Sequence, residues 1–340
     1  MNRELAEKIA NAVLYEGYML YPYRPSAIKN RQRWTFGILY PPAYCEVGGG
    51  SERSEMHSEC LMQVKEHAAV EVRLRFLHLI ARQVAQKMQG RFEPVPALVF
   101  DDRMLESWDE GVERTVEFEV SALGNLPQRV AFSFPAREEA ELLRDRSGSV
   151  VGSITRSQQE VKGLAAVAAQ TIQDGVLKLS IEVTNTTWLP PDAIDRNSAL
   201  LRSLLSAHVV LTATRGEFVS LLDPPEAFQE AVRACKNLGN LPVLVGEQGE
   251  RDMLLCSPII LYDYPQIAPE SAADFFDATE IDEMLTLRVI TLSEREKDEM
   301  RRGDDHVRKL LQRTEQNARQ QLMRTHGTMR SLRPRATNHD

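Results

Sequence analysis

The chain has 340 residues and carries 41 Lys or Arg against 49 Asp or Glu, a formal net charge of −8. Hydrophobic residues make up 43% and charged residues 26%, which is the composition of a globular protein that can bury a core. No apolar run reaches the roughly 18 residues of a membrane span, and the N-terminus lacks the apolar segment of a signal peptide. Four cysteines without framework spacing indicate reduced thiols, so we expect a cytoplasmic protein.

The charge is distributed unevenly along the chain. Residues 301–340 contain ten Arg or Lys and four Asp or Glu, a net charge of +6, which leaves −14 on residues 1–300. A nucleic-acid-binding body is expected to be basic, so this layout argues against a nucleic-acid partner.

Residues 2–16 predict a helix, because Leu5, Ile9 and Val13 recur on one face. Residues 15–44 hold six of the eight tyrosines, mixed with basic side chains. Such a mixture can stack on bases or bind phosphate, but on an acidic body we interpret it as packing or a protein interface. The candidate partner-binding residues in this stretch are Tyr21, Tyr23, Arg24, Lys29, Arg31 and Trp34.

Cys45, His57 and Cys60 are the candidate metal ligands. They surround a polar, glycine-rich loop predicted over residues 46–58, and thiolate and imidazole are the ligands that zinc prefers. The paired spacing of zinc sites is absent, so the alternative interpretation is a loop histidine with two packing cysteines. A transition metal is the cofactor such a site would hold; otherwise we expect none.

Period-two alternation predicts strands over residues 60–65, 69–80, 91–100, 113–123 and 129–134. Residues 77–89 leave a helix open, and the charged residues 137–149 predict a helical turn followed by a loop. Asp174-Gly175 predicts a hairpin between a first arm at 158–173 and a second arm at 176–187, although the alanine-rich first arm leaves a helix open.

The following elements are predicted from local signals. A short helix is expected within 191–206, a strand over 208–214, and a helix from Asp223-Pro224-Pro225 to Gly239, with Phe228 and Cys235 on its buried face. A short strand follows at 241–246.

Residues 257–292 predict a strand at Ile259–Leu261, a proline-containing loop, an acidic helical turn capped by Thr279, and a second apolar run. Carboxylates interleaved with apolar residues fit a docking surface better than a calcium loop. The candidate partner-binding residues here are Asp274, Asp277, Glu280, Asp282 and Glu283. A capping box at Ser293 then predicts a charged helix to about residue 321.

These elements predict an α+β, β-rich fold with antiparallel sheets, sandwich-like in its second half, and with N-terminal and C-terminal helices. We expect an aromatic-rich α+β region over 1–150, a β-sandwich-like region over 151–292, and a charged helix with a basic tail over 293–340. The sequence has no GxSxG, HExxH, P-loop or kinase motif, so we expect no catalytic residues and a binding protein rather than an enzyme.

Three stretches carry a family resemblance: AVLYEGYMLYPYRPSAIKNRQRWTFGILYPP at 12–42, the segment from GEFVSLLDPPEAFQ to YPQIAPES at 216–271, and FFDATEIDEMLTLRVITLSEREKDEMR at 275–301. Together they resemble a family of bacterial hydrogenase accessory proteins encoded beside [NiFe] hydrogenases, especially the high-affinity hydrogen-oxidising kind. The resemblance implies an accessory role in maturation or assembly, with a [NiFe] hydrogenase subunit or another maturation protein as partner. It brings no catalytic residue. The alternative function is a metal-carrying or redox protein that uses Cys45, His57 and Cys60.

Overall fold

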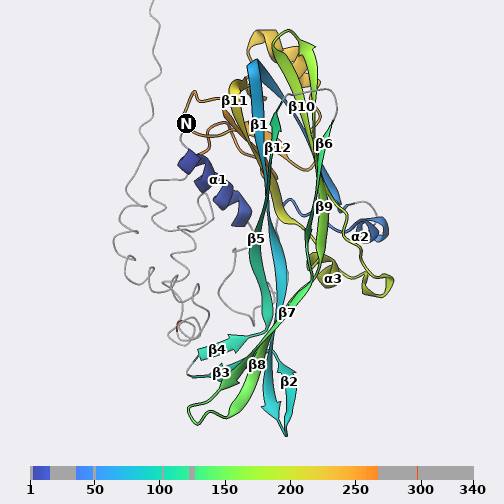
Figure 1. Cartoon of the computed structure of the whole chain (residues 1–340), viewed down its shortest axis with the longest axis vertical. Helices are drawn as coiled ribbons and strands as arrows, with labels where there is room; N and C mark the ends of the chain where they lie inside the picture. Colours follow the sequence, from blue (N-terminus) through green and yellow to red (C-terminus); the bar gives the residue numbers. More distant parts are fainter. Residues whose placement is uncertain are drawn as a thin grey trace, which may run out of the picture.

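The computed structural model describes residues 3–15, 36–48, 51–101, 103–121, 127–266 and 297. Strands dominate these residues, and every pairing between them is antiparallel (Figure 1). The predicted β-rich α+β class is therefore confirmed. The helices are α1 (Arg3–Tyr15), α2 (Pro42–Val47), α3 (Arg196–Leu200) and α4 (Gln229–Arg233), with single 3-10 turns at Pro191–Ala193 and Glu226–Phe228.

The strands follow one another along the chain with few helical interruptions. They are β1 (Glu55–Met88), β2 (Arg91–Val95), β3 (Ala97–Phe100), β4 (Arg103–Glu106), β5 (Trp108–Ser121), β6 (Gln128–Phe134), β7 (Arg137–Arg144), β8 (Val150–Gln158), β9 (Val161–Gln173), β10 (Val176–Asn185), β11 (Leu205–Phe218), β12 (Leu241–Leu244) and β13 (Met253–Ser257).

Strand β1 is 34 residues long and lies at the centre of the sheet. It pairs with different strands along its length. Its first part pairs with β10, its middle lies between β11 and β5, and its last part pairs with β8, β5 and β2. The exchange near residues 64–69 coincides with a register shift and with His67, whose φ of 58° lies in the left-handed region. The extra backbone residues of such a bulge let the strand bend without losing its neighbours.

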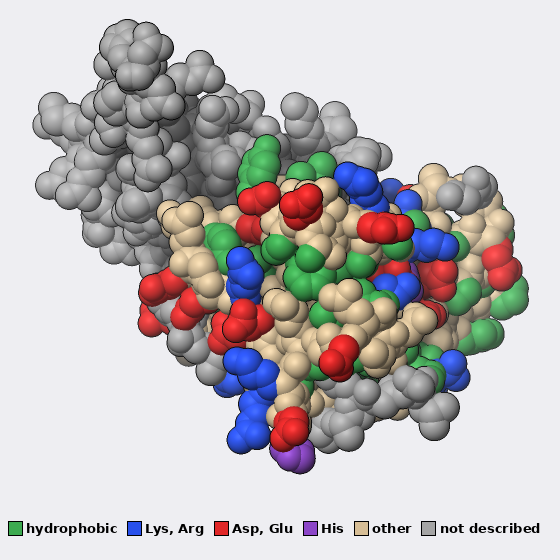
Figure 2. Space-filling view, turned by 90° about the horizontal axis from the view of Figure 1, so that it is seen from above, with side chains coloured by type: hydrophobic (Ala, Val, Ile, Leu, Met, Phe, Trp, Pro, Cys, Tyr) green, Lys and Arg blue, Asp and Glu red, His purple; other side chains and the backbone are tan. Residues whose placement is uncertain are grey.

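The main sheet runs in the order β12-β13-β11-β1-β10-β9-β6, with β5, β8 and β2 also paired to β1 and β7 paired to β8. Strands from both sides of residue 150 therefore share one sheet. The molecule is long, with β2, β3, β4, β7 and β8 at one end and α1 beside the sheet nearer the other end (Figure 1). Figure 2 looks along the long axis at the end opposite β2, β3 and β4, where hydrophobic, acidic and basic side chains are intermingled.

The main core lies on one side of β1, where Val70, Val72, Leu74 and Phe76 are buried with residues of β9, β10 and β11. These positions alternate along the strand, as period-two burial requires. On the opposite side, α1 places Ile9 and Val13 against Val210, Val243 and other residues of β11 to β13. A separate small cluster of Val84, Leu143 and Ile154 stabilises the end formed by β7 and β8.

Several local predictions were wrong. Residues 55–58 begin β1 rather than lie in a loop. For residues 77–88, where the sequence left a helix open beside the predicted strand, the structure has the strand. Residues 137–144 form β7 instead of a helical turn. This segment has no apolar face of its own, but β8 pairs with it along its length, and an edge strand tolerates its charges.

The helix predicted from Asp223 to Gly239 is limited to the 3-10 turn at Glu226–Phe228 and α4, although Phe228 and Cys235 do lie in one buried cluster. The strand predicted at Ile259–Leu261 is absent; β13 forms earlier, at Met253–Ser257. Ser257 explains the end of β13, because its Oγ accepts from the Ile259 amide at 3.2 Å and donates to the Ile259 carbonyl at 2.8 Å. These local bonds compete with a continued ladder.

Candidate functional site

The predicted metal ligands do not come together. His57 and Cys60 are three residues apart on β1, so their side chains leave opposite faces of the strand. Cys60 is buried in the main core, whereas Cys45 packs beside Tyr40 and Leu189 in a different cluster. Within the described ranges, no group of three His, Cys, Asp or Glu residues is arranged to hold a metal ion.

The thiols are also poorly suited to metal or redox chemistry. All four cysteines are free, and burial raises the pKa of each, to about 11 for Cys235 and about 12 for Cys256. A thiol with a raised pKa is protonated at neutral pH and is a weak nucleophile and ligand. The prediction of a Cys45, His57 and Cys60 site is therefore corrected: Cys45 and Cys60 are packing residues.

His57 instead lies beside a buried carboxylate that joins three segments. Its Nε2 is 3.7 Å from Glu59 Oε1, and Lys178 Nζ of β10 is 3.1 Å from the same oxygen. The Lys236 amide, after α4, donates to Glu59 Oε2 at 2.8 Å. Burial raises the pKa of Glu59, but the Lys236 amide and the Lys178 ammonium outweigh it and the net pKa is lowered. Glu59 thus holds the α4 loop against the sheet.

The partner-binding residues predicted from the sequence lie outside the described residues. This holds for the aromatic and basic set, Tyr21, Tyr23, Arg24, Lys29, Arg31 and Trp34, and for the acidic set, Asp274, Asp277, Glu280, Asp282 and Glu283. Both sets stay predictions.

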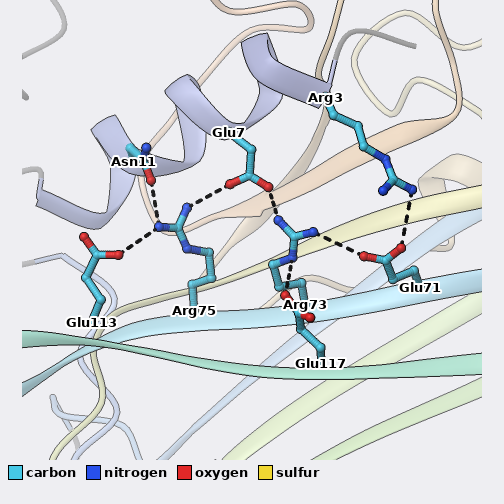
Figure 3. Close-up of polar contacts among 8 residues, drawn as sticks. All are labelled: Arg3, Glu7, Asn11, Glu71, Arg73, Arg75, Glu113 and Glu117. Atoms are coloured by element: carbon cyan, nitrogen blue, oxygen red, sulfur yellow. Dashed lines mark hydrogen bonds and ion pairs between the residues drawn. The ribbon is translucent and has the colours of Figure 1, made fainter.

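Two arginines of β1 lie in a cluster of polar side chains from α1, β1 and β5 (Figure 3). Arg73 pairs with Glu7 of α1, with Glu71 at 3.2 Å and with Glu117 of β5 at 2.8 Å. Their side chains leave β1 on the α1 side of the sheet. The cluster therefore ties α1 to two neighbouring strands.

Arg75 is the more buried of the two, with 7% of its side chain exposed. It lies 3.5 Å from Glu7 Oε2, 2.7 Å from Asn11 Oδ1 and 3.3 Å from Glu113 Oε2 of β5 (Figure 3). A buried guanidinium is costly unless it is paired, and here three partners from two elements satisfy it. Sequence analysis missed this cluster, although Glu7 and Asn11 at i, i+4 and two arginines two residues apart in an apolar strand were visible signals.

Next to this cluster, residues 258–262 leave β13 with alternating environments. Ile259 and Leu261 pack against the hydrophobic cluster between α1 and β11 to β13. Ile260, in contrast, is 89% exposed and Tyr262 is 83% exposed. Asp263 anchors the end of the segment, since its Oδ1 accepts from the Leu244 amide at 2.8 Å and its Oδ2 from Ser220 Oγ at 2.5 Å. An anchored segment with outward apolar side chains is a surface suited to a protein partner.

Two of the stretches that carry the family resemblance, residues 12–42 and 216–271, come into contact at this surface. Gly37 has a φ of +58°, and a Cβ there would lie 2.5 Å from Pro258 Cβ. The neighbouring Phe36 is 49% exposed. Gly37 and Pro258, far apart in sequence, therefore pack against each other.

No protein-family model and no curated protein matches the chain. Among solved structures, the chain is similar to the secretin InvG of the Salmonella SPI-1 type III secretion injectisome. The match to the structure of InvG in the open gate state has 13% sequence identity and a TM-score of 0.14. It covers 60% of this chain and 51% of the InvG chain, so this chain spans about half of that length. A second InvG structure gives 12% identity, a TM-score of 0.13 and coverage of 74% and 75%. In the described residues, no helix is long and apolar enough to cross a membrane.

Proposed function

We propose that this chain acts by binding another protein, and that its partner is a [NiFe] hydrogenase subunit or a protein of hydrogenase maturation. The observation that carries the binding part is the anchored segment 258–262, which exposes Ile260 and Tyr262 while its alternate residues pack. The hydrogenase part is supported by the resemblance of residues 12–42, 216–271 and 275–301. A cytoplasmic location belongs to the same proposal.

Binding is favoured over catalysis by what the polar clusters do. Glu59 and the Arg73–Arg75 cluster are saturated by partners from neighbouring elements, so their charges hold the fold together. A general acid or base needs a group that a substrate can reach. These groups are committed to other residues of the chain.

The test is complementation of a gene deletion in the native host, with hydrogenase activity and the amount of assembled enzyme as readouts. We expect the deletion to lower both and the wild-type chain to restore them. Ile260→Ser combined with Tyr262→Ser should fail to restore them while folding normally, because both side chains are exposed. The control is Trp188→Ser, which removes another apolar side chain, 72% exposed, elsewhere on the surface. Normal hydrogenase in the deletion strain would refute the proposal.

A further inference from the structure

The path β5-β1-β10-β9-β6 bends so that its two end strands approach each other. At one end of this approach, Gln128 Nε2 of β6 donates to the Glu119 carbonyl of β5 at 3.2 Å. At the other end, the Arg114 guanidinium of β5 lies 4.9 Å from the centre of the Phe134 ring of β6. Within the described ranges no backbone ladder joins the two strands, since β5 pairs with β1 and β6 with β9. We call these two facing strand edges the β5/β6 seam.

The seam is lined with apolar side chains that are only partly buried. Val116 and Phe118 come from β5, and Phe132 and Phe134 from β6; all four pack against the main core without being fully enclosed. The alternate residues of β5 point the other way, where Glu113 and Glu117 pair with the arginines under α1. The seam is therefore an apolar strip between two strand edges.

Arg114 lies at the Phe134 end of this strip and differs from the three paired arginines of β1 and from Arg156 of β8. Arg73, Arg75, Arg82 and Arg156 each have a carboxylate partner. Arg114 has the amide oxygen of Gln158 at 2.6 Å and the Phe134 ring, but no ion pair with any described carboxylate. Nearby His78 is fully buried, and burial lowers its pKa to about 4, so its ring is neutral and neither adds to nor cancels the charge of Arg114. This end of the seam thus carries positive charge without a counter-charge.

As far as the described residues go, the edge of β6 also lacks the protection that edge strands usually have. Edge strands usually carry prolines or charges that prevent another strand from pairing. Edge strand β12 contains Pro242 and β2 contains Pro94, while β7 has charged residues at five of its eight positions. β6, Gln128–Phe134, has no proline and a single charged residue, Arg129.

From these observations we propose that the β5/β6 seam binds an extended peptide segment of a partner protein by strand addition, with apolar side chains at every second position and a carboxylate that pairs with Arg114. The inference rests on the proposed protein-binding function and names a surface for it. Beyond the contact between Gln128 and Glu119, an added strand would pair with backbone groups on the facing edges of β6 and β5, and its apolar side chains would cover Phe132 and Phe118. An acyl chain with a carboxylate would cover the same apolar strip but would leave those backbone groups unpaired, so a peptide fits better.

The test selects binders to the full chain from a phage-displayed library of random decapeptides, then measures the affinity of the synthetic enriched peptides. We expect enriched sequences that alternate apolar and polar residues and contain an acidic residue. Hydrogen–deuterium exchange of the wild-type complex should show new protection in residues 113–119 and 129–134. No enrichment, or protection confined to other strands, would overturn the proposal.

Substitutions test the role of charge. Arg114→Gln should weaken peptide binding at least about tenfold, because it leaves the peptide carboxylate without its partner, and Arg114→Lys should restore part of the affinity. Arg129→Gln, on the outward face of β6, is the matched control and should bind as the wild type does. Equal binding by the wild type and Arg114→Gln, with both folded by thermal denaturation, would also overturn the proposal.

The same variants separate this inference from the proposed function. A hydrogenase subunit that binds Arg114→Gln as well as the wild type would exclude the seam and leave the hydrogenase proposal standing. Peptide binding at the seam by a chain whose deletion leaves hydrogenase normal would do the reverse.

Discussion

His208 is a fully buried base beneath α1, on the same side of the sheet as Arg75. Its Nδ1 donates to the Ser206 carbonyl at 2.8 Å, and its Nε2 has no partner among the described residues. Burial, together with the charge of Arg75, lowers the pKa of His208 to about 4 from its ordinary value of 6.5. The folded protein therefore holds this imidazole neutral.

This lowered pKa predicts a loss of stability in acid. Between pH 6.5 and 4 the unfolded chain binds the proton that the folded chain excludes, so the free energy of unfolding falls as pH falls through that window. At pH 4, the lowered pKa of His208 reduces the free energy of unfolding by on the order of 3 kcal/mol, and this loss vanishes above pH 6.5. Urea unfolding at pH 7 and pH 4.5 should show a smaller acid loss for His208→Asn. Exposed His67→Asn should keep the wild-type loss; an unchanged loss in His208→Asn would contradict the assignment.

Gly163 on β9 is a second residue whose identity is fixed by one contact. It pairs with Phe132 across the ladder, and a Cβ at Gly163 would lie 2.2 Å from Phe132 Cζ. The ring covers the glycine and helps fix the register of β6.

Gly163→Val should therefore destabilise the chain by about 1–3 kcal/mol, because the Phe132 ring must leave its position over the strand. Chemical denaturation measures this. Lys162→Val, on the exposed side of the same strand, should change stability by less than about 0.5 kcal/mol. A Gly163→Val protein as stable as the wild type would show that the ring does not pack there.

Among the elements, helix α1 is attached to the sheet both by its apolar face and by the Arg73–Arg75 cluster. Ile9 and Val13 pack on β11 to β13, while Glu7 bridges Arg73 and Arg75. Because Glu7 is 39% exposed and Arg75 keeps Glu113, the expected cost of Glu7→Gln is modest, about 1 kcal/mol.

That cost should appear locally, as faster amide exchange in residues 5–14 with little change in β9 and β10. The control is Glu4→Gln on the same helix, which removes a carboxylate whose partner among the described residues is Lys8, and which should leave exchange near the wild-type rate. If both variants exchange alike, Glu7 does not hold the helix.

Element prediction from the sequence worked where a segment carried its own apolar face. The alternation of residues 69–80, 113–123 and 176–187 predicted β1, β5 and β10. The turn at Asp174-Gly175 predicted the hairpin that β10 forms with β9. It failed where partners decide the structure. β7 is a strand because β8 pairs with it, and Ile259–Leu261 is not one because Ser257 satisfies its backbone locally.

At the scale of the whole molecule, the long β1 could be predicted only in pieces. Each half alternates, but the left-handed His67 that lets one strand serve five neighbours has no signal in the sequence. The predicted metal site failed for a related reason. Closeness along the chain suggested His57 and Cys60, and the two-residue period of the strand separated them.

The most direct test of the account is affinity purification of the tagged full chain from its native host, grown anaerobically under hydrogenase-inducing conditions, with quantitative mass spectrometry. The account predicts enrichment of a [NiFe] hydrogenase subunit or maturation protein over an unrelated tagged control, and its loss with Ile260→Ser combined with Tyr262→Ser. Recovery of the folded chain without any hydrogenase protein, from cells shown to contain the enzyme, would contradict the account.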